Sequence, residues 1–223
     1  MSRLPADPEG FIRANTALAT PAMVPEFKLW LASEYVPIWQ ATEAWMEEQN
    51  IDPPYWAFCW PGGQAIARYL LDHPQEVRGK RVIDFAAGSG VSALAAAQAG
   101  AKSVLANDID ALSLVATRLN AATNGLVLDV CPDDWLAGED GRPEADVVIA
   151  GDVCYEQQMS ARALGWLRGH AQRGRLVLLG DPGRNYFSAQ GLEERARYNI
   201  PTSLQLENRG MRETVVWRVL PQP

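Results

Sequence analysis

The sequence has little of what marks several large classes of protein. It holds three cysteines and two histidines, with no CxxC spacing among them, which argues against a disulfide framework and against a zinc site. No apolar run approaches the ~18–20 residues that a membrane span needs, and the first thirty residues lack the charged and apolar regions of a secretion signal. We therefore expect a soluble, cytoplasmic protein with no bound metal.

Basic residues are also scarce. Lysine and arginine number 20 against 27 aspartates and glutamates, which gives a formal net charge of −7. Proteins that bind nucleic acid carry a basic patch as an electrostatic footprint, and no basic run occurs here. We expect a basic protein partner or a small molecule as substrate, and neither nucleic acid nor a membrane as partner. The oligomeric state stays open.

Length and composition indicate one domain with an N-terminal extension. A chain of 223 residues, 48% of them hydrophobic, is long enough for one core. Residues 1–25 contain four prolines, which favours an irregular arm, and the apolar residues of 26–35 recur at helical spacing. We predict an arm and helical extension over 1–52, with a further helix over 41–49, and one compact unit over 53–223.

From residue 80 onward, short β-rich runs alternate with helical segments, the pattern of βαβ units in a mainly parallel sheet. The expected strands are 82–85, 103–106, 126–130, 146–150 and 175–179, and the expected helices are 64–71, 91–99 and 111–123. A last helix is predicted over 192–198, and 203–207 and 214–219 flank a hairpin turn at Asn208, Arg209 and Gly210. The expected fold class is α/β, with helices on both faces and a C-terminal antiparallel hairpin.

A small-residue loop follows the first expected strand and opens a helix, in the run VIDFAAGSG at 82–90. Gly88 and Gly90 let the backbone approach a ligand, and Ala86 keeps the neighbouring wall low. Asp84, near the carboxyl end of the strand, is placed to attract a cationic group. The loop therefore predicts a cofactor site.

A second acid lies about twenty residues beyond that loop. Asn107 and Asp108 end the second strand, where a carboxylate can accept both ribose hydroxyls of an adenosine ligand. Two acids at two strand ends would thus bracket one cofactor.

The loop alone does not identify the cofactor, because 88–93 also satisfies GxGxxA, the dinucleotide fingerprint. Asp84 favours S-adenosylmethionine: a pyrophosphate prefers helix amides without a nearby carboxylate, whereas the methionyl ammonium is stabilised by an acid. A nicotinamide oxidoreductase remains the alternative, and a third possibility is that small residues merely allow close helix packing.

The segment after the third strand contains Asp133, Asp134 and Trp135. One of the two aspartates can accept the adenine amino hydrogen bond while Trp135 gives an apolar face. A turn with a helix cap and a core tryptophan is an equally good interpretation.

The reaction site is expected just past the fourth strand, where open α/β sheets bind ligands at the switch in strand order. The run Gly151-Asp152-Val153-Cys154-Tyr155-Glu156 puts two carboxylates and a phenol there. Asp152 is predicted to bind an incoming ammonium, with Tyr155 or Glu156 positioning the amine; the alternative for Asp152 is a helix cap or turn residue. The prolines of the Asp/Asn-Pro-Pro-Tyr/Phe motif of adenine amino methyltransferases are missing. Cys154 has no His beside it, which favours a buried thiol.

These motifs resemble methyltransferase family 16. The resemblance lies in Trp60-Pro61-Gly62-Gly63-Gln64, 82–90, 106–110 and 151–156, and it is greatest to the lysine methyltransferases of the electron transfer flavoprotein beta subunit and their bacterial relatives. It implies a Rossmann-like class I methyltransferase fold with seven strands, Trp60 and its glycine turn over the cofactor, and a lysine accepted at 152–155. Ala86 departs from the usual Gly.

The resemblance thus implies a protein-lysine N-methyltransferase that acts on the electron transfer flavoprotein beta subunit. A ribosomal protein or a small amine such as nicotinamide is the alternative substrate. The expected cofactor-binding residues are Trp60, Gly63, Asp84, Ala86, Gly88, Gly90, Asn107, Asp108, Asp134, Trp135 and Gly151, and the expected catalytic residues are Asp152, Tyr155 and Glu156.

Overall fold

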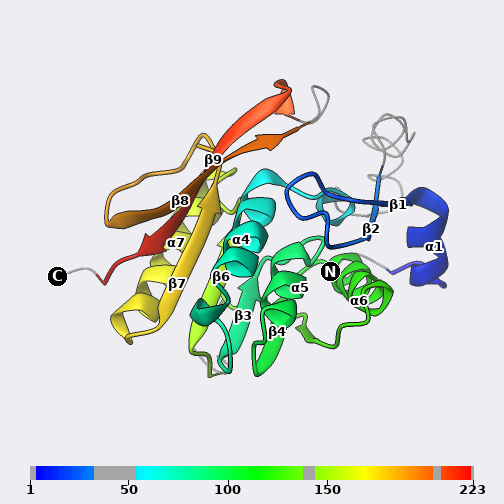
Figure 1. Ribbon diagram of the computed structural model, residues 1–223, viewed down its shortest axis with the longest axis horizontal. Coiled ribbons are helices and arrows are strands. Elements are labelled where there is room, and N and C mark those ends of the chain that lie inside the picture. Colours follow the sequence, from blue (N-terminus) through cyan, green and yellow to red (C-terminus); the bar gives the residue numbers. More distant parts are fainter. Residues whose placement is uncertain (1–3, 33–53, 138–143, 203–206, 222–223) are drawn as a thin grey trace.

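A seven-stranded sheet forms the centre of the molecule in the computed structural model, which describes residues 4–32, 54–137, 144–202 and 207–221 (Figure 1). The strand order is β5-β4-β3-β6-β7-β9-β8. Five of these strands are parallel, and β9 runs antiparallel to both of its neighbours. The strands are β3 (Arg81–Phe85), β4 (Ser103–Asn107), β5 (Asp129–Cys131), β6 (Val147–Gly151), β7 (Leu176–Asp181), β8 (Leu192–Pro201) and β9 (Met211–Val219). The predicted fold class is confirmed.

Helices cover both faces of the sheet because its central strands are apolar on both sides. In β6, Val147 and Ile149 belong to one buried cluster and Val148 and Ala150 to the other, as side chains that alternate along a strand must. Figure 1 shows α4 (Pro61–Asp72) and α5 (Val91–Gln98) on the first face and α7 (Gln157–Gln172) on the second. Within the described ranges, no helix combines the length and the apolar character that a bilayer crossing requires.

Most strand and helix predictions in the sheet region are confirmed within two residues. The helix α6 (Ala111–Thr123) has the predicted bounds, and Asp110 caps it by accepting a hydrogen bond from the Leu112 amide at 2.9 Å. Three elements begin three residues away from the prediction: α4 at Pro61 rather than at residue 64, β9 at Met211 rather than at residue 214, and β5 at Asp129 rather than at residue 126. The preceding residues pack beside the first cluster instead of pairing with β4.

The helix predicted over 192–198 is wrong, because these residues lie in β8. Charged residues give the segment a helical composition, but its buried or half-buried side chains alternate at Ala196, Tyr198 and Ile200, which is the strand period. Its partner is β9, paired from Leu192 to Pro201. The predicted strand over 203–207 is therefore displaced by β8, and residues 203–206 lie outside the described ranges. Asn208, in the predicted turn, has a φ of 53°.

The N-terminal predictions also need correction. The arm contains a helix, α1 (Pro8–Asn15), which Asp7 caps through a 2.9 Å bond from the Gly10 amide. The segment predicted as helical over 26–35 instead contains β2 (Leu29–Leu31), paired antiparallel with β1 (Ala17–Ala19). Its extended backbone is fixed by α6, since the Trp30 amide donates to Asn120 Oδ1 at 2.7 Å. The predicted helix over 41–49 lies outside the described ranges.

Among the described residues, two short 3-10 helices flank α4: η1 (Tyr55–Ala57) precedes it and η2 (Pro74–Glu76) follows it. Figure 1 places α1 and β2 beside α6 at one end of the sheet, and the β8–β9 hairpin at the other. Because β3, β4, β6 and β7 are parallel, their carboxyl-terminal ends lie at the same edge of the sheet. We call it the carboxyl edge.

Candidate functional site

The loop between β3 and α5 has three residues in the left-handed region. Their φ angles are 54° for Ala86, 55° for Gly88 and 78° for Gly90. A Cβ on Gly90 would lie 2.7 Å from the Thr117 side chain, whereas one on Gly88 would have no atom within 4 Å. Gly88 therefore presents bare backbone to open space, as the predicted ligand approach requires. Ala86 adopts a conformation that L-residues other than Gly take only with strain.

Asp108 joins the end of β4 to this loop, so the structure brings together two parts of the predicted cofactor site. Its Oδ2 accepts hydrogen bonds from the Gly88 amide at 2.9 Å and from Ser113 Oγ at 2.7 Å, and its Oδ1 accepts one from the Asp110 amide at 3.0 Å. Burial raises the pKa of this carboxyl. The Ile109 amide also stabilises the charged form of Asp108, so contact with a ribose stays a prediction.

Asp84 has a contact that the sequence did not predict. Its side chain is buried and Oδ2 accepts a 2.9 Å hydrogen bond from the Ala93 amide, in the first turn of α5. A carboxylate at that place satisfies one of the free amides of the helix start. Burial raises the pKa of Asp84 to about 8. Its contact with a ligand ammonium stays a prediction.

The residues predicted near an adenine have partners within the chain. Asn107 Nδ2 donates to the carbonyls of Cys131 at 3.0 Å and Asp133 at 2.9 Å, which ties β4 to the segment after β5. Asp134 Oδ1 accepts from the Leu136 amide at 2.9 Å, a turn contact. Trp135 is buried and stacks on Trp166, with ring centroids 5.9 Å apart. Asp134 thus forms the predicted turn and Trp135 is a core tryptophan. Contacts of either residue with an adenine stay predictions.

Glycines allow the start of α4 to lie directly on the ends of β6 and β7. A Cβ on Gly62 would lie 2.3 Å from the Gly180 carbonyl oxygen, and one on Gly151 would lie 2.7 Å from the Gly63 nitrogen. Backbone at this separation leaves no room for any other residue. Gly63 and Gly151, which the sequence analysis placed in the cofactor site, are therefore in contact with each other.

Asp152 fixes this junction with both of its side-chain oxygens. Oδ2 accepts from the amides of Gly62 at 2.6 Å and Gly63 at 3.2 Å, and Oδ1 accepts from Arg184 Nη2 at 2.7 Å. The residue is buried and has a φ of 58°. Burial raises the pKa of Asp152, while the Arg184 charge opposes the rise. Asp152 thus satisfies two backbone amides at the start of α4, which agrees with the helix-cap interpretation. Its binding of a substrate ammonium stays a prediction.

Arg184 continues the network toward the C-terminal hairpin. It donates to both carboxylate oxygens of Glu207, at 3.0 and 2.7 Å, and Glu207 Oε2 also accepts from Arg212 Nε at 2.9 Å. The guanidinium carbon of Arg184 lies 5.5 Å from the centre of the Trp60 ring. Sequence reasoning missed this network. A lone arginine after a strand end was the available signal.

Four aromatic rings gather above the junction. The ring centroids of Tyr55 and Tyr155 are 5.6 Å apart, those of Tyr55 and Trp60 are 6.2 Å apart, and those of Phe58 and Trp60 are 5.7 Å apart. Tyr55 is 45% exposed and Tyr155 is 49% exposed. The pKa of Tyr155 is raised by burial and then by Tyr55 and the charge of Asp108. Sequence reasoning identified Trp60 but missed Tyr55 as a site residue.

The remaining two residues of the predicted reaction loop differ in exposure. Glu156 is exposed and caps α7, with Oε1 accepting from the Gln158 amide at 3.3 Å. Cys154 is buried, and burial raises the pKa of its thiol to about 11. A thiol in that state is a poor nucleophile, in agreement with the prediction of a buried cysteine.

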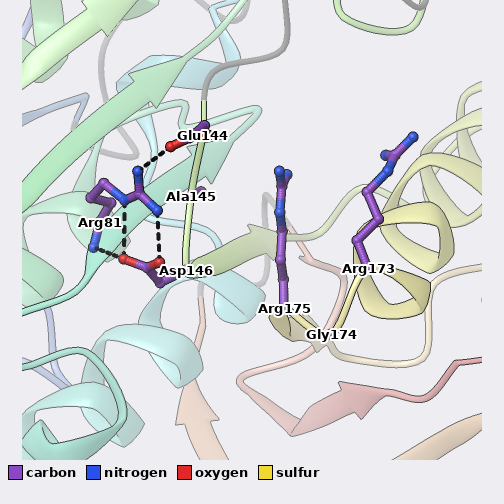
Figure 2. Close-up of a pocket in the computed structure, with 7 residues that line it drawn as sticks. All are labelled: Arg81, Glu144, Ala145, Asp146, Arg173, Gly174 and Arg175. Carbon is purple, nitrogen blue, oxygen red and sulfur yellow. Dashed lines mark hydrogen bonds and ion pairs between the residues drawn. The ribbon is translucent and has the colours of Figure 1, made fainter.

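Figure 2 shows a cavity of about 330 Å³ at the opposite edge of the sheet, which we call the amino edge. It is lined by the start of β3, by residues 144–146 just before β6 and by the turn between α7 and β7. On one side of it Arg81 pairs with Glu144 at 2.5 Å and Asp146 at 2.9 Å. None of the predicted site residues lines it.

Known proteins resemble this chain over two different extents. The family model described as ribosomal protein L11 methyltransferase (PrmA) matches residues 67–153. Electron transfer flavoprotein beta subunit lysine methyltransferases match nearly the whole chain. The Xenopus laevis protein is 38% identical over 96% of this chain and 87% of its own length, and the Mus musculus protein is 35% identical over 94% and 83%.

Solved structures show the same fold. A ribosomal protein L11 methylase from Lactobacillus delbrueckii superposes with a TM-score of 0.51, at 23% identity, covering 71% of this chain and 78% of that one. Magnesium protoporphyrin IX methyltransferase from Synechocystis, with bound S-adenosylmethionine, gives a TM-score of 0.52 at 16% identity, covering 70% and 77%. The sheet described above is therefore the class I methyltransferase fold.

Proposed function

The chain belongs to the family of electron transfer flavoprotein beta subunit lysine methyltransferases, and we propose from this premise that it methylates a lysine of that subunit with S-adenosylmethionine as the methyl donor. The observation that carries the proposal is the 38% sequence identity to the Xenopus laevis relative, which extends over 96% of this chain and 87% of that protein. The full-length relatives compared come from animals, so they give no support to the expected bacterial relatives. The L11 family model covers only 67–153, the part with the cofactor loop.

The residues of the carboxyl edge fit S-adenosylmethionine. Bare backbone at Gly88 faces open space, and the Asp108 carboxylate lies 2.9 Å from the Gly88 amide at the end of the neighbouring strand. We assign the adenosyl group to these two residues and the covering wall to Trp60. When bound, the cofactor supplies a methyl group on a sulfonium centre that is open to attack by an amine.

The chain's residues would then prepare the amine. A lysine has an ordinary pKa of about 10.4, so it must lose a proton before its lone pair can form the N–C bond while the S–C bond breaks. Tyr155, half-exposed at the reaction loop, orients the amine, and Glu156 receives the proton close to solvent. Asp152 was predicted to be catalytic; in this proposal it is a positioning residue, because both oxygens hold α4 and Arg184.

The acidic balance of the chain supports a protein substrate. The net charge of −7 favours approach of a lysine-bearing surface, since complementary charge speeds encounter. The extension over 1–52 is proposed to belong to the docking surface, and 53–223 to the methyltransferase unit.

The test is methyl transfer with purified components. We would incubate the chain with labelled S-adenosylmethionine and, in parallel, with electron transfer flavoprotein, ribosomal protein L11 and nicotinamide. We expect label in the beta subunit alone, and mass spectrometry should place it on lysine. Label only in L11 or only in nicotinamide would give the substrate assignment to that molecule instead. Substrate variants with each labelled Lys→Arg serve as the matched control.

A further inference from the structure

We infer that the contacting rings of Tyr55 and Tyr155 together line one side of the port through which the substrate lysine reaches the methyl donor, and that their exposed surfaces hold the amine and its methylated products. This inference rests on the proposed function and adds to it the element that recognises the lysine head group. Tyr55 is a residue that neither the sequence pattern nor the family match assigned.

The geometry of the pair carries the inference. Tyr55 comes from η1, which precedes α4, and Tyr155 comes from the loop after β6, so two distant segments of the chain bring the rings to 5.6 Å between centroids. The two residues are nearly half exposed, at 45% and 49%. Tyrosine is enriched at interfaces, where its ring is covered while its hydroxyl stays in contact with water.

The neighbours of the pair limit what else could bind the lysine. The face of the Trp60 ring is occupied by the Arg184 guanidinium at 5.5 Å. Asp152, the nearest buried carboxylate of the loop, has both oxygens bonded to α4 and to Arg184. A substrate ammonium would have to displace those bonds to reach it. The exposed tyrosine faces require no such displacement.

The chemistry of aromatic walls suits repeated methylation. Removing water from an ammonium disfavours its charged form and lowers the lysine pKa, which helps to produce the neutral amine. A methylated ammonium is weakly hydrated and is attracted to aromatic faces, by about 0.5–2 kcal/mol. The same two rings would therefore accept the monomethylated side chain as a new substrate.

Three substitutions at one position separate ring chemistry from packing. Tyr55→Ala removes the ring, Tyr55→Leu keeps apolar bulk without a ring face, and Tyr55→Phe keeps the face without the hydroxyl. We expect the KM for the protein substrate to rise about 3- to 30-fold in the Ala and Leu variants, with the Phe variant near wild type. The affinity for S-adenosylhomocysteine, measured by calorimetry, should not change in any of them.

Two outcomes would overturn the inference. If Tyr55→Leu matches Tyr55→Phe, the ring face has no role; if the Ala variant loses S-adenosylhomocysteine affinity, Tyr55 belongs to the cofactor site. A second measurement keeps the test independent of the protein substrate: titration of the wild type with free trimethyllysine in the presence of S-adenosylhomocysteine. Binding of trimethyllysine that disappears in the Leu variant supports the port, whether or not the flavoprotein is methylated. Absence of flavoprotein methylation would count against the proposed substrate alone.

Discussion

Two arginines at opposite edges of the sheet each bridge two carboxylates, but they do so in different surroundings. Arg81 at the amino edge pairs with Glu144 and Asp146, and these side chains are 39%, 82% and 42% exposed. Arg184 at the carboxyl edge pairs with Asp152 and Glu207, with exposures of 15%, 11% and 3%. The same kind of ion pair therefore contributes differently to stability at the two edges, because water screens the charges around Arg81 and is largely excluded from those around Arg184.

The titration of the carboxyls shows the same contrast. Arg81 lowers the pKa of Asp146 to about 2, whereas burial raises that of Asp84 to about 8 and that of Asp181 to about 6. Two of the three non-glycine residues with left-handed backbone in the described ranges, Ala86 and Asp152, also follow strands at the carboxyl edge, and the third, Asn208, lies in the turn between β8 and β9. Strain and desolvated charge thus gather where the ligand sites are expected, and the fold tolerates them there because the rest of the sheet is well packed.

The largest effect should come from Arg184→Met. This substitution leaves Asp152 buried without its cation, and breaking a buried pair in this way destabilises by about 3–5 kcal/mol. Urea unfolding would measure it. The double variant Arg184→Met/Asp152→Asn, which removes the stranded charge as well, should recover part of the loss. A double variant as unstable as the single one would show that Arg184 acts through packing or through Glu207 instead.

A second effect concerns pH. The folded-state pKa of Asp84, about 8, lies above its unfolded value of about 4, so the folded state binds this proton more tightly. Stability from this group is fully present below about pH 4 and is lost as pH rises toward 8. Between pH 5 and 7 the wild type should lose about 2 kcal/mol of unfolding free energy relative to Asp84→Asn. Parallel curves for the two proteins would contradict a raised pKa.

A smaller change is expected from Ala86→Gly. Left-handed backbone costs an L-residue about 1–2 kcal/mol, and glycine loses about 0.5–1 kcal/mol more entropy on folding, so the variant should gain between about 0 and 1.5 kcal/mol. Gly88→Ala is the matched control in the same loop, with a φ of 55° and open space around the new Cβ. It should lose stability by a similar amount and weaken S-adenosylhomocysteine binding.

The smallest effect should come from Arg81→Met. Exposed ion pairs contribute little because solvent and salt screen them, so the melting temperature and the methylation rate should stay within experimental error of the wild type. A drop comparable to that of Arg184→Met would remove the distinction between the two edges and would point to a function for the amino-edge cavity.

Local patterns in the sequence were sufficient for the parallel part of the fold. The buried strands read as apolar runs, and the helices between them carry their own start and stop signals, such as Asp110 before α6. The cofactor loop and Asp108 were predictable for the same reason, since each occupies a strand end. The hairpin was not predictable, because β8 has the composition of a helix and becomes a strand only by pairing with β9.

The parts of the site that depend on distant contacts could not be predicted. From the sequence, Asp152 is a candidate ligand residue with a cap or turn residue as the alternative, and only its bonds to Gly62 and Gly63 show that it satisfies amides at the start of α4. Tyr55 and Tyr155 are a hundred residues apart in the sequence, and nothing local links them. Glu207 looks like an ordinary polar residue of a hairpin, yet the structure buries it between two arginines.

The glycine contact at the start of α4 also sets an order of assembly. Gly62 rests on Gly180, and four strands of the sheet, β3 to β6, lie between them along the chain. During synthesis α4 must leave the ribosome long before β7 exists to receive it, with the apolar face that later includes Ile66 and Leu70 uncovered. Slow translation or truncation before residue 180 should therefore produce chains that engage chaperones, a liability that circular permutation to place α4 after β7 would relieve.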